Sequence, residues 1–159
     1  MTELAIARAL HVIAVVLWIG GVGMVTLTLL PAARHIRTPE ERLKFFARIE
    51  KAFIPQARIW MLVAGLSGLY MVHVLDAWSL FGALQYWWLD AMVLVWLFFA
   101  AMLFVIEPLN RRRAARRPPP DADRLVARLQ RLHWIVLTVS LITIAGAVAG
   151  SHGYLLFSH

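Results

Sequence analysis

Four apolar stretches constrain the fold of this chain more than any other feature of its sequence. They cover residues 4–30, 53–75, 84–106 and 132–157. Each is long enough to cross a hydrocarbon core of about 30 Å, for which an α-helix needs about 20 residues. Backbone polar groups in lipid must be paired within their own segment, which favours helices. The sequence therefore predicts an all-α integral membrane four-helix bundle, built as a single transmembrane domain over residues 1–159.

The amino-acid composition agrees with a membrane location and restricts the kinds of cofactor site. The chain is 61% apolar, with a mean hydropathy of +0.71, whereas soluble domains are about 45–50% apolar. It contains no cysteine, which excludes disulfides, thiolate metal sites and haem attached through a Cys-x-x-Cys-His motif. Any metal or cofactor must therefore be held by histidine, methionine, carboxylate or backbone groups.

The basic residues predict how the bundle is oriented. Of the 16 Lys and Arg residues, seven lie within residues 34–58 and eight within residues 111–131. By the positive-inside rule, both basic loops face the cytoplasm and both termini lie outside. We expect a multi-pass protein of the bacterial inner membrane, whose net charge of +7 contacts anionic lipid headgroups. Because no aromatic or recognition element accompanies the RRRAARR run, nucleic acid is not an expected partner.

Helix-start signals occur in both basic loops. The TPEE sequence at residues 38–41 is a capping box with proline at the first helical position, and it predicts a short amphipathic surface helix over Glu40–Lys51. The apolar side chains of this helix, Phe46 among them, are expected to face lipid. In the second basic loop, Asp121 or Asp123 is expected to cap a helix that continues into the fourth span.

The histidines can be ordered by depth, because the helical rise is 1.5 Å per residue. His11 is expected about 10 Å below the outer end of the first span, and His152 roughly 7–8 Å below the outer end of the fourth. Ionisable residues inside a span are costly and normally face a partner in the bundle interior. His11 and His152 are therefore the best-matched candidate ligands, with His73 as the substitute for either or as an interfacial anchor. His35 and His133 are expected at the inner membrane surface.

Two further residues share the His11 face of the first span. Trp18 follows His11 by seven residues, so its ring is expected beneath the imidazole. Arg8 precedes His11 by three residues and is the one cation available near the outer surface for the propionates of a haem. The alternative for Arg8 is a snorkelling side chain paired with Asp76 or Asp90.

Two other patterns concern helix packing. Gly146, Gly150 and Gly153 form a small-residue stripe on the fourth span. Stripes of this kind let helices approach closely, either inside the bundle or against a second copy in a homodimer. Arg58 and Glu107 fall at the inner ends of the second and third spans, where they are expected to form a structural ion pair.

The first half of the chain carries a series of motifs that resembles known membrane families. In order, these are Leu10-His11, Trp18, Gly20-Gly21, Leu30-Pro31, Phe53-Ile54-Pro55 and the GLSGLY sequence at residues 65–70. The pattern resembles the CopD-like copper-resistance proteins and the HemJ-type protoporphyrinogen oxidases. The resemblance implies a four-helix bundle with an outer-facing metal or haem site, and a b-type haem bound at His11. The third span has Asp90 where the HemJ-type enzymes carry a basic residue.

These observations lead to one principal functional expectation and two alternatives. Without cysteine, the axial ligands of a haem iron must be histidine or methionine. We expect a membrane protein that binds haem b and transfers single electrons near the periplasmic face, between quinol and a periplasmic acceptor or oxidant, as a membrane oxidoreductase. The first alternative is copper transport or resistance of the CopD type, although soft Cu(I) favours thioethers and only Met71 lies near His73. The second is a scaffold without redox chemistry, with membrane lipids and a second copy as its partners.

Overall fold

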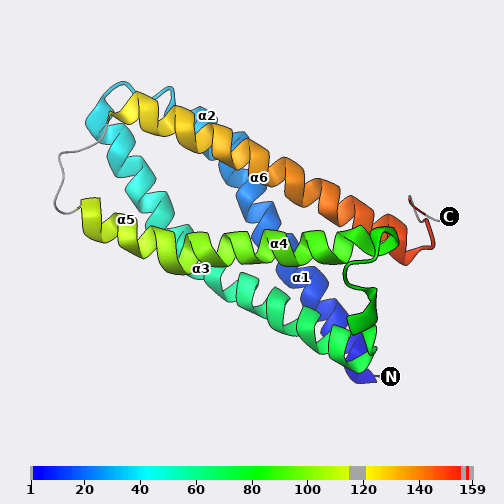
Figure 1. Ribbon diagram of the computed structural model, residues 1–159. Helices are drawn as coiled ribbons and strands as arrows, with labels where there is room; N and C mark the ends of the chain where they lie inside the picture. The colour runs from blue at the N-terminus through cyan, green and yellow to red at the C-terminus, as the bar shows by residue number, and fades with distance from the viewer. Residues whose placement is uncertain (1, 115–120, 155–156, 158–159) are drawn as a thin grey trace.

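The structure is a computed structural model that describes residues 2–114, 121–154 and 157. Within this part of the chain, four helices are long and apolar enough to cross a membrane (Figure 1); they run over Thr2–Ala33, Pro39–Val74, Leu84–Arg113 and Ala122–Ser151. The all-α four-helix architecture expected from the sequence is therefore confirmed. The chain is a multi-pass membrane protein.

Two of the four spans are uninterrupted α-helices and two change helix type along their length. The first span consists of α1 (Thr2–Met24), the π-helical segment η1 (Val25–Leu29) and α2 (Leu30–Ala33). The second is α3 (Pro39–Val74), and the fourth is α6 (Ala122–Ser151). The third follows the short 3₁₀ turn η2 (Ala77–Leu80). It consists of the 3₁₀ turn η3 (Leu84–Tyr86), α4 (Trp87–Ala100), the π-helical η4 (Ala101–Ile106) and α5 (Glu107–Ala114).

The helices associate as two pairs, which contact each other through the central core and at one end of the bundle. The closest association is between α1 and α3, followed by that between α4 and α6. The starts of α3 and α6 and the end of α5 gather at one end, called here the basic end (Figure 1). The start of α1 and the end of α6 lie at the opposite end, called the terminal end, where Figure 1 shows them well apart. The described parts of both basic loops therefore lie at the same end of the bundle, as the charge pattern requires.

The segment Glu40–Lys51, expected as a separate surface helix, is the first third of α3. The Thr38 hydroxyl caps this helix by accepting a hydrogen bond from the Glu41 amide at 3.3 Å. The helix then continues through Pro55, although proline removes one backbone donor. Phe46 does not face lipid but is buried in a cluster with residues of α2 and α6. Packing of this face against the bundle explains why the segment does not lie along the membrane surface.

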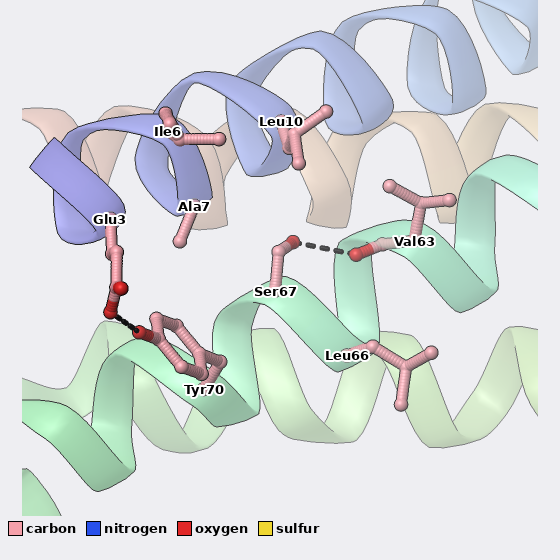
Figure 2. A pocket seen from close by; sticks show the side chains of 8 residues that line it. All are labelled: Glu3, Ile6, Ala7, Leu10, Val63, Leu66, Ser67 and Tyr70. Carbon is pink, nitrogen blue, oxygen red and sulfur yellow. Dashed lines mark hydrogen bonds between the residues drawn. The ribbon is translucent and has the colours of Figure 1, made fainter.

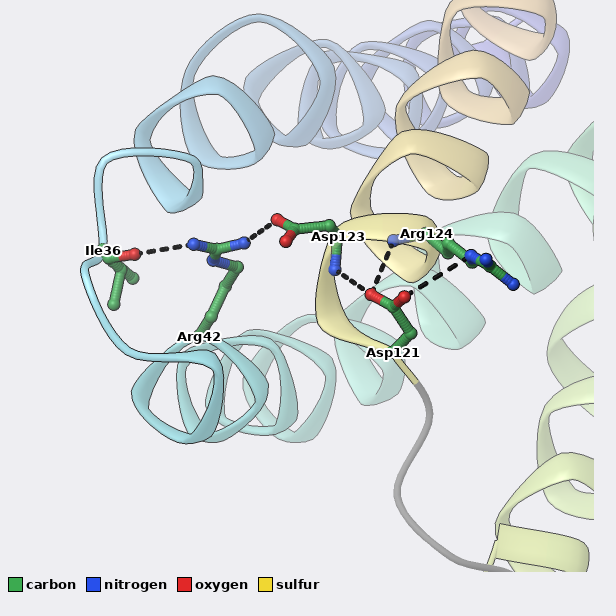
Figure 3. A network of polar contacts seen from close by, with 5 residues as sticks. All are labelled: Ile36, Arg42, Asp121, Asp123 and Arg124. Atoms are coloured by element: carbon green, nitrogen blue, oxygen red, sulfur yellow. Dashed lines mark hydrogen bonds and ion pairs between the residues drawn. The ribbon is translucent and has the colours of Figure 1, made fainter.

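A polar network ties the start of α3 to the start of α6 (Figure 3). The buried Arg42 guanidinium forms an ion pair with Asp123 and donates a hydrogen bond to the Ile36 carbonyl at 2.9 Å. Asp121 caps α6 by accepting from the backbone amides of Asp123 and Arg124. The sequence predicted either aspartate as the cap, and in the structure the cap is Asp121. Asp123 is instead the residue that joins the two helices.

The π-helical segments supply backbone carbonyls to neighbouring helices. A π-helical turn shifts the backbone bond from i−4 to i−5, which leaves a carbonyl free for another donor. In η1 the Thr26 carbonyl accepts from the Gln130 amide of α6 at 2.9 Å. In η4 the Leu103 carbonyl accepts from Nε and Nη2 of Arg58 at 3.1 and 2.7 Å. Arg58 Nη2 also lies 2.8 Å from Glu107 Oε2, which confirms the expected ion pair.

Aromatic rings on neighbouring helices cover four of the glycines. An added Cβ would lie 2.3 Å from the Phe53 ring at Gly21, 2.5 Å from Trp96 at Gly65, 2.5 Å from Trp87 at Gly146 and 2.2 Å from Trp88 at Gly150. These contacts join α1 to α3, α3 to α4, and α4 to α6. Gly146 and Gly150 of the expected stripe therefore pack inside the chain, against the two tryptophans that begin α4, whereas Gly153 lies beyond α6 and an added Cβ there would have nothing within 4 Å.

The fourth span ends earlier than expected, and this changes the position of His152. Gly153 has a left-handed backbone conformation, with φ of +87°, which glycine adopts without steric cost. Its amide donates to the Gly150 carbonyl at 3.0 Å, and the Tyr154 amide donates to Ala149 at 3.1 Å. This pair of bonds is a Schellman cap. His152 is consequently the exposed C-cap residue of α6 and does not lie within the span, as the predicted range 132–157 required.

Candidate functional site

His11 is held between α1 and α3 by small residues of α3. Its Nδ1 atom lies 2.8 Å from the Ala64 carbonyl oxygen and 3.3 Å from Ser67 Oγ. A Cβ added at Gly68 would lie 3.1 Å from His11 Cε1, so a larger residue at this position would crowd the imidazole. Residues 64, 67 and 68 share one face of α3, because they are three and four positions apart. This face positions the His11 ring inside the helix pair.

The partners of Nδ1 determine which ring nitrogen of His11 carries the proton. The Ala64 carbonyl can only accept a hydrogen bond, so Nδ1 is the donor. The Ser67 hydroxyl donates to the Val63 carbonyl at 2.6 Å, as Figure 2 shows, and therefore offers only a lone pair to His11. In a neutral imidazole, Nε2 is then unprotonated. Histidines that bind metals commonly have this arrangement, with the second nitrogen donating to a backbone carbonyl.

The described structure does not bring the other two candidate ligands to His11. His152 is exposed, and its Nδ1 lies 2.8 Å from the Val148 carbonyl of its own helix. His73 is exposed near the end of α3, nine residues beyond Ala64, which places it half a helical turn away from the face that holds His11. The three histidines lie toward the terminal end of their helices, but they do not form one cluster.

His35 and His133 provide a comparison with His11. The Nδ1 atom of His35 lies 3.2 Å from the Pro31 carbonyl, and that of His133 lies 2.9 Å from Leu129. Both contacts are made within one helical segment, four residues apart. His11 differs because its carbonyl partner belongs to another helix, 53 residues along the chain. Among the described histidines with a ring hydrogen bond, only His11 joins two spans in this way.

Trp18 and Arg8 occupy different environments on α1. Trp18 is buried in the central core, where its ring packs edge-on against Phe99 of α4 with centroids 4.7 Å apart. Arg8 is exposed. The alternative ion pair of Arg8 with Asp76 or Asp90 is not formed within the described residues, and the Asp90 carboxylate accepts from the Gly82 amide at 3.1 Å. Arg8 is therefore accessible to an anionic group, whereas Trp18 supports the core below His11.

A groove opens beside His11, on the outer face of the α1–α3 pair (Figure 2). Its volume is about 440 Å³, and it is lined by Glu3, Ile6, Ala7, Leu10, Val63, Leu66, Ser67 and Tyr70. The GLSGLY motif contributed to a family resemblance in the sequence, but no sequence pattern predicted this groove. A small-residue periodicity at Ala64, Ser67 and Gly68 was the available sign of close packing. No local pattern connects Glu3 to Tyr70, which are 67 positions apart.

The described residues offer a haem iron one histidine at this position. His11 provides an imidazole with a fixed tautomer, but the described residues place no second histidine against it. The described part of the chain also contains no group of three or more His, Cys, Asp or Glu side chains arranged to hold a metal ion. The expected ligand pair of His11 with His152 or His73 is therefore not formed in this arrangement.

Comparisons of the chain with protein-family models, with curated proteins and with solved structures gave no significant match.

Proposed function

We propose that this chain is a membrane protein that binds haem b and takes part in one-electron transfer, with His11 as the axial ligand supplied by the protein. The observation that carries the proposal is the bond between His11 Nδ1 and the Ala64 carbonyl. It orients the ring from a neighbouring span and leaves the lone pair on Nε2 for a metal. The ring is half-buried within the helix pair, where an imidazole without a function would be costly.

The arrangement favours one protein ligand over the pair expected from the sequence. His152 caps α6, and His73 lies on the far side of α3 from His11. When bound, haem would supply a one-electron couple whose potential depends on the axial ligand and its burial. His11 would hold the iron, and the exposed Arg8 would face the propionates. By the positive-inside rule, the basic end is cytoplasmic and the site lies toward the periplasm.

The test is the absorption spectrum of the purified full-length protein, oxidised and reduced, with haem quantified after extraction. His11→Gln is the informative variant, because its amide can still donate to the Ala64 carbonyl but lacks a strong ligand for iron. His133→Gln is the matched control, since His133 is also half-buried with Nδ1 on a carbonyl. We expect a Soret band in the wild type and the control, and at least about a tenfold loss of haem in His11→Gln.

Two results would count against the proposal. A red His11→Gln protein with an unaltered spectrum would show that the imidazole is structural. A colourless wild-type protein, produced with haem available, would remove the haem assignment, and stoichiometric copper in that preparation would favour the CopD-type alternative. The variants His152→Gln and His73→Gln are expected to retain haem. Loss of haem in either one would show that the helices rearrange to supply a second ligand.

A further inference from the structure

The groove beside His11 is an open depression between α1 and α3, large enough to take part of a small lipophilic molecule. Its volume of about 440 Å³ lies within the range of about 300–1,000 Å³ that is usual for small-molecule sites. It faces away from the bundle, and the side chains of Ile6, Leu10 and Leu66 on its walls are exposed. In a membrane this face meets lipid, so a ligand would enter from the bilayer.

One end of this groove is polar and the rest is apolar. Figure 2 shows Glu3 and Tyr70 together at one end, with Leu10 and Val63 toward the other. The Tyr70 hydroxyl donates to Glu3 Oε2 at 3.2 Å. Among the lining residues, which all belong to the described part of the chain, Glu3 alone is charged. The groove therefore combines an apolar channel with one hydroxyl and one carboxylate.

We infer that this groove binds the head group of a membrane quinol or quinone, with its ring at the Glu3–Tyr70 end and its hydrocarbon tail along the apolar walls. The inference names the redox partner of the proposed function. The role of this partner as electron donor or acceptor depends on that function, whereas the binding itself does not.

The polar pair can serve both redox forms of such a ligand. A quinol hydroxyl is a donor, and the Glu3 carboxylate can accept from it. A quinone carbonyl is an acceptor, to which the Tyr70 hydroxyl can donate by turning away from Glu3 Oε2, its partner in this structure. A fatty acid or an anionic phospholipid would instead bring a negative carboxylate or phosphate toward Glu3, with no lysine or arginine in the lining to offset it. Like charges brought together in this way disfavour binding. The groove therefore favours a neutral head group with hydrogen-bonding oxygens.

One residue of the groove wall also contacts His11. Ser67 is part of the wall, and its Oγ lies 3.3 Å from His11 Nδ1. A ligand next to Ser67 would thus be separated from the His11 imidazole by one side chain, and a ring at the Glu3–Tyr70 end would lie about one helical turn further away, because Tyr70 follows Ser67 by three residues. This proximity is what a lipid-soluble redox partner of a centre at His11 requires.

The experiment is photolabelling of the full-length protein in phosphatidylcholine nanodiscs with a short-chain azidoquinone, followed by peptide mapping and by competition with decylubiquinol. Leu10→Trp fills the groove, and Leu17→Trp is its control, because Leu17 is similarly exposed on the same side of α1 but lies outside the lining. Tyr70→Phe removes the hydroxyl, and Tyr86→Phe makes the same change at the start of α4.

We expect labelling within residues 3–10 and 63–70, reduced at least about tenfold in Leu10→Trp and unchanged in Leu17→Trp. Tyr70→Phe should weaken competition by decylubiquinol about fivefold, as for the loss of one hydrogen bond, while Tyr86→Phe leaves it unchanged. Equal labelling of Leu10→Trp and wild type would overturn the inference. Competition by oleate as effective as that by decylubiquinol would also overturn it, since the groove would then be a site for acyl chains.

Haem content is measured on the same preparations, so the two proposals can fail separately. A protein without haem that shows groove-dependent labelling refutes the proposed function and retains the quinone site. A haem protein whose labelling ignores Leu10→Trp retains the function and loses the quinone site.

Discussion

Gly65→Ala tests whether aromatic rings packed against glycines hold the α1–α3 pair to the α4–α6 pair. The added Cβ would lie 2.5 Å from Trp96 Nε1 and 2.6 Å from Trp96 Cε2, so the indole must move away from α3. That movement also disturbs the hydrogen bond from Trp96 Nε1 to the Met61 carbonyl, which is 2.9 Å long. The substitution therefore combines overpacking with the loss of a polar contact between α3 and α4.

The expected magnitude follows from three contributions. Overpacking costs about 1–3 kcal/mol, and an interhelical hydrogen bond in a membrane protein contributes about 0.6 kcal/mol on average. Replacing glycine by alanine in a helix returns up to about 1 kcal/mol. With the full return for glycine, the free energy of unfolding should thus fall by about 0.6–2.6 kcal/mol. Gly20→Ala is the control, because an added Cβ there has nothing within 4 Å, and this variant should be as stable as the wild type or slightly more stable.

The measurement is the free energy of unfolding in mixed micelles titrated with sodium dodecyl sulfate, followed by circular dichroism. A double-mutant cycle with Trp96→Phe adds a second check. If the indole is the obstacle, Gly65→Ala should cost less in the Trp96→Phe background than in the wild type. A Gly65→Ala protein as stable as Gly20→Ala would refute this account of how α3 and α4 pack.

Two other predictions concern contacts within the chain. Gly150→Ile should destabilise the fold without changing the oligomeric state seen by native mass spectrometry, because its side chain would meet the Trp88 ring; conversion of a dimer to a folded monomer would contradict the internal packing. Arg58→Ala should lower the free energy of unfolding by about 3 kcal/mol, since it leaves the Leu103 carbonyl without its donor and Glu107 with only the longer pair to Arg111, at 3.6 Å. Glu107→Gln should cost about 1 kcal/mol in the same titration, because the amide oxygen still accepts from Arg58. Equal costs for these two variants would show that the Leu103 carbonyl is unimportant.

The sequence by itself determined the features that depend on local pattern and on charge. The apolar stretches gave the number and approximate limits of the spans, because lipid requires each segment to pair its own backbone. The helix start at Thr38 follows from local capping chemistry. The Arg58–Glu107 pair was also predictable, since both residues were placed at the same depth and carry opposite charges.

Tertiary structure alone decided which residues meet. Helices of equal apolarity can be rotated and tilted in many ways, and the choice depends on how side chains of distant segments fit together. Packing between distant segments places His11 against Ala64 and Gly68. It also buries Phe46, which keeps α3 continuous. The depth of His152 depended on Gly153, whose left-handed conformation ends α6.

The candidate site shows the same division. Depth and residue type were sufficient to select His11 as an interior imidazole. They were not sufficient to place His73 and His152, because depth along a helix does not specify the direction in which a side chain points. No local sequence pattern predicts the groove that contains Glu3 and Tyr70, because it forms only where α1 and α3 lie side by side. Position along each helix was thus set by the sequence, and the rotation of one helix against another was set by packing.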